Sequence, residues 1–470
     1  VATVPLLWII PLSLYLVSFI VAFDHPRWYS RTFHCVATVL VLLLVANYED
    51  SLDHLSTALN FLGGYSGDEA FKLWRSMPLY CIVAFAGLFL VCLVCHCELA
   101  ALKPPPRHLT AFFLTMSAGG ALGGIFCNLV APYIFVTFFE LPLAILAAVA
   151  VAFVFLLMAA RQWRWPGAMP VVAVAGAAAL LLVAYGQIGL PQGNDPQADR
   201  IVLHRARNFY GLVSVEHRSR NEPEYTNFAF RSGHIIHGRQ YADPARRNDT
   251  NIAYWGPGTG SRKAMEHVAK RPGCRIGIVG LGIGTLAGFA KPDDYVRMYE
   301  INPEVVAIAK QYFHFLADCP AKQDIVLGDA RLQLERELRD TGSHQFDVLC
   351  LDAFSGDAVP THLLTDEAFA LYKQHLADDG IIVVNITNTY LDLYPVVKKL
   401  AEKHGLKHTR VFSPGSGGLT YRTYFVLLTN DESFLLATPE TIAELPESFR
   451  KQRDVPLWTD RYHNLFQVLQ

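Results

Sequence analysis

The stretch RIGIVGLGIGT, residues 275–285, decides the fold of the second half of this 470-residue chain. A short apolar run leads directly into three glycines spaced two apart, which are Gly280, Gly282 and Gly284. This pattern predicts a buried strand followed by a tight turn, where glycine backbone lets a ligand approach closely. The fingerprint of NAD-binding proteins would need a glycine in place of Thr285, which disfavours a dehydrogenase.

Strand and helix patterns alternate after this turn. Apolar runs predict strands at residues 275–279, 295–299, 325–327, 346–351 and 381–385. We expect a helix over residues 363–376, with Gly380 ending it before the last of these strands. Two further runs, residues 408–412 and 421–428, predict an antiparallel hairpin at the sheet edge. Repeated βα units imply a parallel sheet with helices on both faces, and the closing hairpin is typical of S-adenosylmethionine-dependent methyltransferases.

The segment before this sheet has a different pattern. Residues 187–199 are rich in Gly, Pro and Asp and predict a linker. Four short alternating runs follow and predict a small antiparallel β region over residues 200–262. Near this region lie three histidines that either line a pocket or, as is commoner, are buried and hydrogen-bonded for structural reasons: His234, His237 and His267.

Charge is distributed unevenly along the chain. Hydrophobic residues make up 52% and charged residues 17%, against about 25% charged in an ordinary soluble domain. Residues 1–186 carry 16 charged side chains, whereas residues 187–470 carry 66. The first part is membrane-like, which excludes a wholly soluble protein, a disordered chain and a disulfide scaffold. A net charge of −2 gives no reason to expect a nucleic-acid partner.

Six stretches without Asp, Glu, Lys or Arg predict membrane spans. They are residues 1–23, 32–48, 76–97, 108–139, 141–160 and 165–194. A spanning helix needs about 20 apolar residues, so the second stretch is the weakest. Further helices could precede Val1. We therefore predict a polytopic α-helical membrane domain of about six helices over residues 1–186, the linker, the β region, and a Rossmann-like, methyltransferase-type α/β domain over residues 263–470.

The predicted topology contains a conflict. Six spans place the basic loops near residues 27–31, 103–107 and 161–164 on one side, which the positive-inside rule makes cytoplasmic. The C-terminal domain would then lie outside, whereas a nucleotide-like ligand is a cytosolic metabolite. Either one span is miscounted, or helices precede the chain, or the domain is truly on the periplasmic side. We favour a multi-pass membrane protein with this domain in the cytoplasm.

The nine cysteines fit no disulfide framework. Cys95, His96 and Cys97 cluster at one predicted helix end, and both residue types bind metals. A second distant Cys/His pair with finger spacing is missing from the sequence, and free cysteine is also a small buried hydrophobe. We therefore predict no metal site.

Four candidate ligand contacts stand at the carboxyl ends of successive predicted strands, where doubly wound sheets bind their ligands. The first is the glycine turn. The second is Glu300, which is placed to accept hydrogen bonds from both ribose hydroxyls. The third is Asp329, followed by Ala330, placed to accept from the adenine amine. The fourth is Asp352, where a general base would stand. Each alone is equally consistent with a turn or a helix cap, and their joint order indicates nucleoside binding.

The C-terminal part resembles spermidine synthase, an aminopropyltransferase that uses decarboxylated S-adenosylmethionine. The resemblance covers about residues 200–430, and with the membrane part the chain is similar to bacterial fused spermidine synthase-like proteins. It rests on the segments 232–240, 254–257, 280–284, 299–302, 328–331 and 351–360, and for the fused proteins also on 95–99 and 108–110.

The resemblance implies roles for these residues. The glycine turn, Glu300 and Asp329 would hold the nucleoside, and Asp352 would help to deprotonate the attacking amine. The chain departs from the family at two places where soluble spermidine synthases carry Asp, because it has Ile283 and Ser355 there. Asp357 is the candidate substitute for the second. An apolar Ile283 cannot bind an ammonium group, which puts putrescine as acceptor in doubt.

Three functions remain open. The first is a membrane-anchored transferase that uses S-adenosylmethionine or its decarboxylated form and a small-molecule amine acceptor. The second is a catalytically degenerate membrane subunit that binds a membrane protein partner or forms a homo-oligomer. The third is a transporter, which nearly uncharged spans disfavour, because transport routes usually carry charges. Membrane lipid is a partner in each case.

Overall fold

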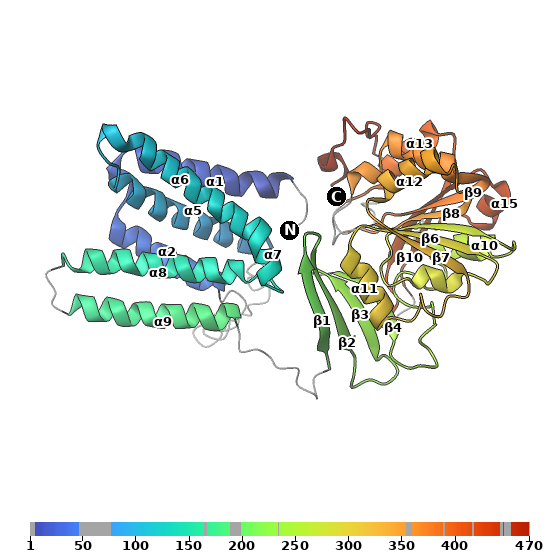
Figure 1. The fold of residues 1–470 in the computed structure, drawn as a ribbon, viewed down its shortest axis with the longest axis horizontal. Helices are drawn as coiled ribbons and strands as arrows, with labels where there is room; N and C mark the ends of the chain where they lie inside the picture. Colours follow the sequence, from blue (N-terminus) through green and yellow to red (C-terminus); the bar gives the residue numbers. More distant parts are fainter. Residues whose placement is uncertain are drawn as a thin grey trace, which may run out of the picture. The chain divides into compact units, whose positions relative to one another are not determined.

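A computed structural model describes residues 5–46, 77–163, 167–188, 199–233, 235–353, 360–388, 391–415, 418–441, 445 and 453–469. The chain divides into two compact units, Thr3–Gly193 and Asn194–Gln470, which are described separately (Figure 1).

The described part of the N-terminal unit is helical. Its α-helices are α1 (Pro5–Asp24), α2 (Arg31–Ala46), α5 (Met77–Ala101), α6 (Leu109–Ile125), α7 (Ala131–Ile134), α8 (Glu140–Ala160) and α9 (Ala168–Ile188). A π-helical turn, Phe126–Val130, joins α6 to α7. Three stretches are long and apolar enough to cross a membrane: Leu79–Ala101, Pro106–Ile134 and Glu140–Ala160. Three further apolar helices are shorter, Ile9–Asp24, Arg31–Ala46 and Ala168–Ala184.

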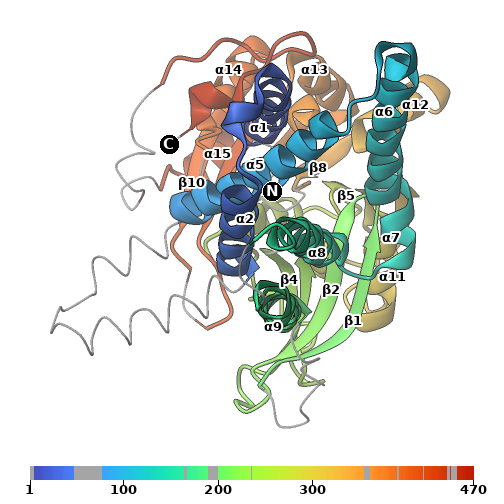
Figure 2. The same ribbon diagram turned by 90° about the vertical axis from the view of Figure 1, so that its left-hand side faces the viewer.

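Helix α2 lies at the centre of this unit. It packs against α5, α8 and α9, and Figure 2 views α8 and α9 nearly along their axes. Its buried residues, among them Cys35 and Leu42, form one apolar cluster with residues of α5, α8 and α9. The stretch with the weakest apolar run in the sequence therefore packs against three other helices.

An ion pair joins one end of α2 to one end of α5. The guanidinium of Arg31 donates two hydrogen bonds, of 2.6 and 2.7 Å, to the two carboxylate oxygens of Glu98. Tyr29 donates a third bond of 2.8 Å to Glu98, whose side chain is buried. A buried carboxylate is stable only with such partners, so this network fixes the two helix ends together.

The C-terminal unit begins with a four-stranded antiparallel sheet in the order β1-β2-β3-β4. Its strands are β1 (Ile201–Asn208), β2 (Gly211–Arg218), β3 (Asn227–Ser232) and β4 (Ile235–Tyr241). The register of β3 and β4 shifts at Phe230, so that His237 is an extra residue on β4. This small sheet confirms the predicted antiparallel β region.

A seven-stranded sheet follows, in the order β10-β11-β9-β8-β5-β6-β7. Its strands are β5 (Arg275–Val279), β6 (Tyr295–Glu300), β7 (Lys322–Leu327), β8 (Phe346–Leu351), β9 (Leu376–Asn385), β10 (Lys407–Ser413) and β11 (Thr423–Thr429). The pairs within β9-β8-β5-β6-β7 are parallel, and β11 pairs antiparallel with both β9 and β10. The predicted Rossmann-like fold with a closing hairpin is confirmed.

Helices and the small sheet bury the two faces of this sheet. The α-helices of the unit are α10 (Gly260–Val268), α11 (Pro303–Tyr312), α12 (Ala330–Asp340), α13 (Asp366–His375), α14 (Tyr394–Lys403) and α15 (Glu432–Ala437). Short 3₁₀ helices in the described chain are Pro26–Trp28, Pro106–His108, Thr285–Phe289, Thr361–Leu363 and Leu465–Val468. One core cluster joins the sheet to α12, α13 and α14, and a second joins it to α10, α11 and the small sheet.

The structure corrects the helix that we expected over residues 363–376. The helix α13 ends at His375, and β9 begins directly at Leu376. The register between β8 and β9 shifts just after the first pair, Phe346 with Leu376. A side chain at Gly380 would lie 2.6 Å from the Phe346 carbonyl oxygen, so this glycine permits a close approach of two strands rather than ending a helix.

Candidate functional site

The glycine turn lies against the backbone of Asp352. Gly280, Gly282 and Gly284 have φ angles of +97°, +54° and +83°, which L-residues rarely adopt. A Cβ atom on Gly280 would lie 2.5 Å from the Asp352 carbonyl oxygen. The Asp352 amide donates to Val279 at 2.9 Å. The turn after β5 and the end of β8 therefore form one compact surface that only glycine backbone can build.

Glu300, the last residue of β6, joins the glycine turn to the start of α11. Its Oε2 accepts a hydrogen bond of 3.1 Å from the Leu281 amide, and its Oε1 accepts one of 2.9 Å from the Asn302 amide. The carboxylate is buried, and burial raises its pKa. Each oxygen keeps a lone pair after these bonds, so Glu300 can accept two more donors such as a vicinal diol.

Exposed apolar side chains lie at the ends of β6 and β7 and at the start of α12. Ile301 is 43% exposed, Leu327 51% and Leu332 63%. Large apolar groups at the end of a sheet offer a surface for a flat aromatic ligand such as adenine. Sequence reasoning missed them, because exposure of a residue next to a strand end is visible only in the fold.

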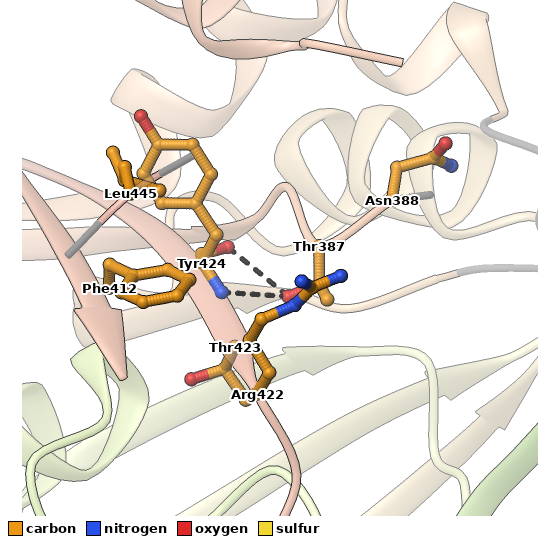
Figure 3. A pocket seen from close by; sticks show the side chains of 7 residues that line it. All are labelled: Thr387, Asn388, Phe412, Arg422, Thr423, Tyr424 and Leu445. Atoms are coloured by element: carbon orange, nitrogen blue, oxygen red, sulfur yellow. Dashed lines mark hydrogen bonds between the residues drawn. The ribbon is translucent and has the colours of Figure 1, made fainter. Parts of the chain in front are cut away.

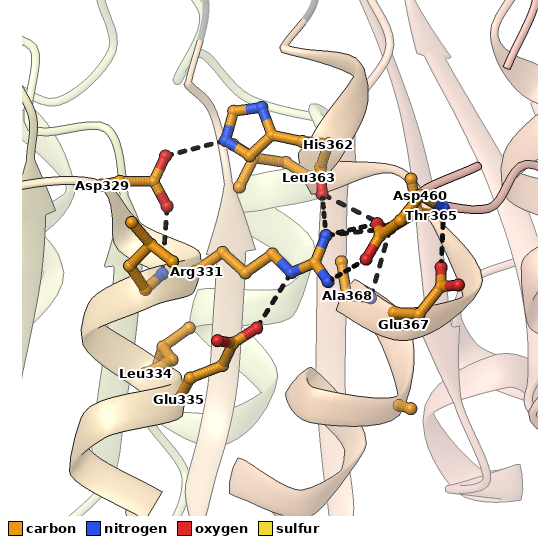
Figure 4. A network of polar contacts seen from close by, with 12 residues as sticks. Asp329, Arg331, Leu334, Glu335, His362, Leu363, Thr365, Glu367, Ala368 and Asp460 are labelled. Atoms are coloured by element: carbon orange, nitrogen blue, oxygen red, sulfur yellow. Dashed lines mark hydrogen bonds and ion pairs between the residues drawn. The ribbon is translucent and has the colours of Figure 1, made fainter. Parts of the chain in front are cut away.

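Asp329 caps a helix and binds a histidine. Its Oδ1 accepts a bond of 3.0 Å from the Leu332 amide at the start of α12, where Ala330 is buried. Its Oδ2 lies 2.8 Å from Nε2 of His362, and this contact holds the pKa of Asp329 below its usual range (Figure 4). Both oxygens already have one partner, so an adenine amine would have to share or displace His362.

An arginine next to Asp329 ties α12 to the C-terminal segment. Arg331 donates two bonds of 2.6 Å to the two carboxylate oxygens of Asp460, and its guanidinium also contacts Thr365 (Figure 4). Residues 331 and 460 are 129 positions apart in the chain. This bidentate pair fixes α12, and with it Asp329, relative to the start of α13.

Asp352 is held by an amide from the neighbouring strand. Asn385, the last residue of β9, donates a bond of 2.6 Å from Nδ2 to Oδ1 of Asp352. Asn385 is itself oriented by the Thr387 amide, which donates to its Oδ1 at 2.9 Å. Burial raises the pKa of Asp352 to about 7, and the bond from Asn385 opposes this rise. A carboxylate with this pKa can accept a proton near neutral pH.

The position of Ile283 explains one departure from the family pattern. Ile283 is 2% exposed, and a Cβ atom on Gly238 of β4 would lie 2.7 Å from it. The side chain therefore fills the core between the small sheet and the glycine turn rather than facing a ligand. Ser355 and the predicted site residue Asp357 lie outside the described residues.

A pocket lies at the carboxyl end of β9, two residues beyond Asn385. Seven described residues line it: Thr387, Asn388, Phe412, Arg422, Thr423, Tyr424 and Leu445 (Figure 3). The Thr387 hydroxyl accepts a bond of 2.9 Å from the Tyr424 amide, which connects the end of β9 to the start of β11. Sequence reasoning missed this pocket, because its walls come from three separate strand ends.

The three histidines singled out in the sequence differ in environment. His267 pairs with Asp431 at 2.9 Å, which is a structural contact. His237 has a buried Nε2 without a hydrogen-bond partner among the described residues, and burial lowers its pKa to about 4. His234 lies outside the described residues. In the helical unit His96 contacts Ser18 at 3.0 Å, and the described residues bring together no group of three metal-ligand side chains.

Comparison with known proteins places this geometry in a family context. No family model matches the chain. It is 29% identical over 192 residues to a polyamine aminopropyltransferase of Vibrio vulnificus, a match that covers 40% of this chain and 60% of that protein. It is 30% identical over 113 residues to a probable polyamine aminopropyl transferase of Bifidobacterium longum, covering 23% of each. The C-terminal unit is homologous to the polyamine aminopropyltransferases.

The chain is also similar to a methyltransferase and, in fold, to a solved structure of a probable spermidine synthase. A stretch of 109 residues is 34% identical to an N-terminal histidine N-methyltransferase of Emericella nidulans, covering 23% of this chain and 19% of that protein. A probable spermidine synthase structure from Corynebacterium glutamicum is 19% identical with a TM-score of 0.38, covering 48% of this chain and 79% of that one. The chain spans 60% or less of the length of these curated relatives.

Proposed function

We propose that this chain is a membrane-anchored transferase that binds an S-adenosylmethionine-type nucleoside and transfers its aminopropyl or a related group to an amine. The observation that carries the proposal is the placement of Asp352, held by Asn385, directly against the glycine turn. The homology of the C-terminal unit to aminopropyltransferases supports the same reading.

The residues at the carboxyl edge of the sheet fit such a nucleoside. The glycine turn brings its backbone to this edge through three positive φ angles, and Glu300 keeps lone pairs for the ribose hydroxyls. Exposed Ile301 and Leu332 would contact the adenine ring, and Asp329 would accept from its amine in exchange with His362. S-adenosylmethionine, or its decarboxylated form, would supply an electrophilic carbon next to a sulfonium.

Asp352 receives the proton in the proposed reaction. The amine nitrogen forms a bond to the carbon next to sulfur, the carbon–sulfur bond breaks, and its electron pair goes to the sulfur. The amine must lose one proton, because an ammonium group has no free pair. With a pKa of about 7, Asp352 accepts that proton at neutral pH. Before the transfer, the Asn385 amide stabilises the ionised carboxylate of Asp352.

The helical unit would anchor the enzyme in the bacterial inner membrane as a multi-pass domain. Three stretches that are long and apolar enough to cross a bilayer support this, and membrane lipid would contact the helical unit. We place the C-terminal unit in the cytoplasm, where the nucleoside is made. Labelling of single cysteines in intact and opened cells would test the sidedness, and labelling from outside would overturn it.

A catalytically degenerate membrane subunit, acting through a protein partner or as a homo-oligomer, is the second candidate. Buried Ile283 in place of an acidic residue and the occupied carboxylate of Asp329 favour it. The two readings differ in turnover, because only the first converts a nucleoside.

The test is formation of methylthioadenosine by detergent-purified protein. The protein is incubated with S-adenosylmethionine or its decarboxylated form and a set of amines, and products are measured by mass spectrometry. We expect methylthioadenosine and an alkylated amine in equal amounts, with at least a hundredfold loss in Asp352→Asn, which should melt no lower than the wild type. Equal product in wild type and Asp352→Asn would reject the role of Asp352, and no product from the folded wild type would reject the transferase.

A further inference from the structure

One positively charged side chain, that of Arg422, lines the pocket beyond Asn385. Arg422 lies just before β11 and is exposed, and the other described lining residues are uncharged. Within the described ranges no carboxylate forms an ion pair with Arg422. Figure 3 shows its side chain running toward Thr387, which follows the strand end that holds Asn385. The pocket therefore offers a guanidinium without a described carboxylate partner, at the edge of the sheet where β8 and β9 end.

A second arginine contacts Tyr421, the residue before Arg422. Arg239 of β4 donates from Nε to the Tyr421 hydroxyl and from Nη1 to Asn227 Oδ1 at 3.1 Å. It also lies over the Tyr421 ring, 5.5 Å from its centre. Its hydrogen-bond partners among the described residues, Tyr421 and Asn227, are neutral, so a second guanidinium lies against the residue that precedes Arg422.

The nearby carboxylates do not neutralise the pocket. Glu440 is bound by Arg410 through two hydrogen bonds of 2.9 and 3.0 Å. Asp392 is buried and is not one of the residues that line the pocket. An acceptor that enters the pocket would thus contact the Arg422 guanidinium rather than a carboxylate.

Strand order separates this pocket from the nucleoside contacts. The glycine turn, Glu300 and Asp329 follow β5, β6 and β7, on one side of β8. The pocket residues follow or precede β9, β10 and β11, on the other side. Asp352 follows β8 and stands between the two sets, as a group that takes a proton from the acceptor must.

We propose that Arg422 binds an anionic group, a carboxylate or a phosphate, on the amine acceptor, so that the acceptor is an anionic amine rather than a diamine. A guanidinium is always charged and matches both anions with two parallel hydrogen bonds. It repels the second ammonium of a diamine. This inference rests on the proposed function and assigns the acceptor class at the same site.

The test compares acceptors and variants in the detergent-purified full chain. The acceptors are putrescine and 1,3-diaminopropane as diamines, β-alanine and ornithine as carboxylates, and 2-aminoethyl phosphate. We expect kcat/KM for at least one anionic amine to exceed that of both diamines at least tenfold. Arg422→Gln lowers that value at least tenfold, chiefly through KM, and Arg422→Lys restores part of it. A preference among carboxylate and phosphate acceptors identifies the anion.

Controls separate this inference from the proposed function. Arg336→Gln, an exposed arginine on α12, should change neither acceptor choice nor rate. Calorimetric affinity for methylthioadenosine should be equal in wild type and Arg422→Gln. Preference for diamines, or a fall in nucleoside affinity in Arg422→Gln, would overturn the acceptor assignment and leave the transferase standing. Failure of the wild type to bind any nucleoside would reject both.

Discussion

Asn385 Nδ2 lies 2.6 Å from Oδ1 of Asp352 and joins the carboxyl ends of two adjacent parallel strands, β9 and β8. The same Asp352 lies with its carbonyl oxygen against Gly280 at the end of the next strand. Three neighbouring strands thus fix one carboxylate at the edge where sheets of this kind bind ligands. The predictions below concern this arrangement and the elements that support it.

The pH dependence of transfer should follow Asp352. Only the ionised carboxylate accepts a proton, so the rate should rise with pH around the pKa of about 7. Asn385→Leu removes a bond that favours the ionised form, and the midpoint should move to higher pH. Initial rates between pH 5.5 and 9.5 measure it. An unchanged midpoint in Asn385→Leu would show that this bond does not tune the base.

The ionised carboxylate of Asp352 should destabilise the folded C-terminal unit at high pH. A carboxyl whose folded pKa lies above its unfolded value of about 3.9 binds its proton more tightly in the folded state. The stabilisation that protonated Asp352 gives the folded state is complete below pH 4 and is lost as pH rises through 7. Asp352→Asn should therefore be neutral at pH 4 and stabilising at pH 8, by on the order of 2–4 kcal/mol. Thermal unfolding at both pH values checks this, and equal effects would contradict it.

Gly280→Ala should destabilise the C-terminal unit. The substitution combines a φ of +97° with a Cβ contact of 2.5 Å to the Asp352 backbone, and we expect a loss of about 3 kcal/mol. Gly342→Ala is a matched control, because its φ is +86° but nothing lies within 4 Å of the added atom. It should cost about 1 kcal/mol. Similar melting temperatures for the two variants would refute the close approach.

Much of this arrangement could be predicted from the sequence because it is local. The apolar run before Gly280 predicts a buried strand, and acidic residues directly after apolar runs must gather at one edge of a parallel sheet. Asn302 before Pro303 likewise predicts the start of α11, and its side chain does cap that helix. These inferences need only neighbouring residues and the geometry of βα units.

The rest depends on contacts between distant residues. Asn385 is one of many polar residues near a strand end, and nothing local distinguishes it as the partner of Asp352, 33 positions away. The pair Arg331–Asp460 and the pocket around Arg422 arise for the same reason. Gly380 is of the residue type that commonly ends a helix. In the structure it lies within a strand and permits the close approach of β8 and β9, because tertiary packing overrides local preference.

Asp329 and His362 should have opposite effects on nucleoside affinity. His362→Ala frees Oδ2 of Asp329 and should raise affinity for methylthioadenosine about two- to fivefold, in line with one weak hydrogen bond. Asp329→Ala should lower affinity about tenfold and also remove the α12 cap, which costs ~1 kcal/mol. Asp329→Ser keeps a capping oxygen and separates the two effects in calorimetry. A loss of affinity in His362→Ala would mean that the histidine itself binds the ligand.

The ion pair of Arg31 and Glu98 should stabilise the helical unit. Arg31→Met leaves the buried carboxylate of Glu98 with Tyr29 as its remaining partner among the described residues and should cost ~3 kcal/mol. Arg31→Met combined with Glu98→Gln removes the uncompensated charge and should recover more than half of the loss. Unfolding of the detergent-solubilised chain gives both values. Additive losses in the double variant would show that the two side chains do not interact.

Nucleoside binding tests the central claim most directly. Titration calorimetry of the detergent-purified full chain would use S-adenosylmethionine, its decarboxylated form and methylthioadenosine, with Glu300→Gln as the matched variant. The account predicts that at least one of the three binds, and that Glu300→Gln weakens it at least tenfold while the melting profile is retained. Absence of binding by folded wild type, or equal affinity in Glu300→Gln, would contradict it.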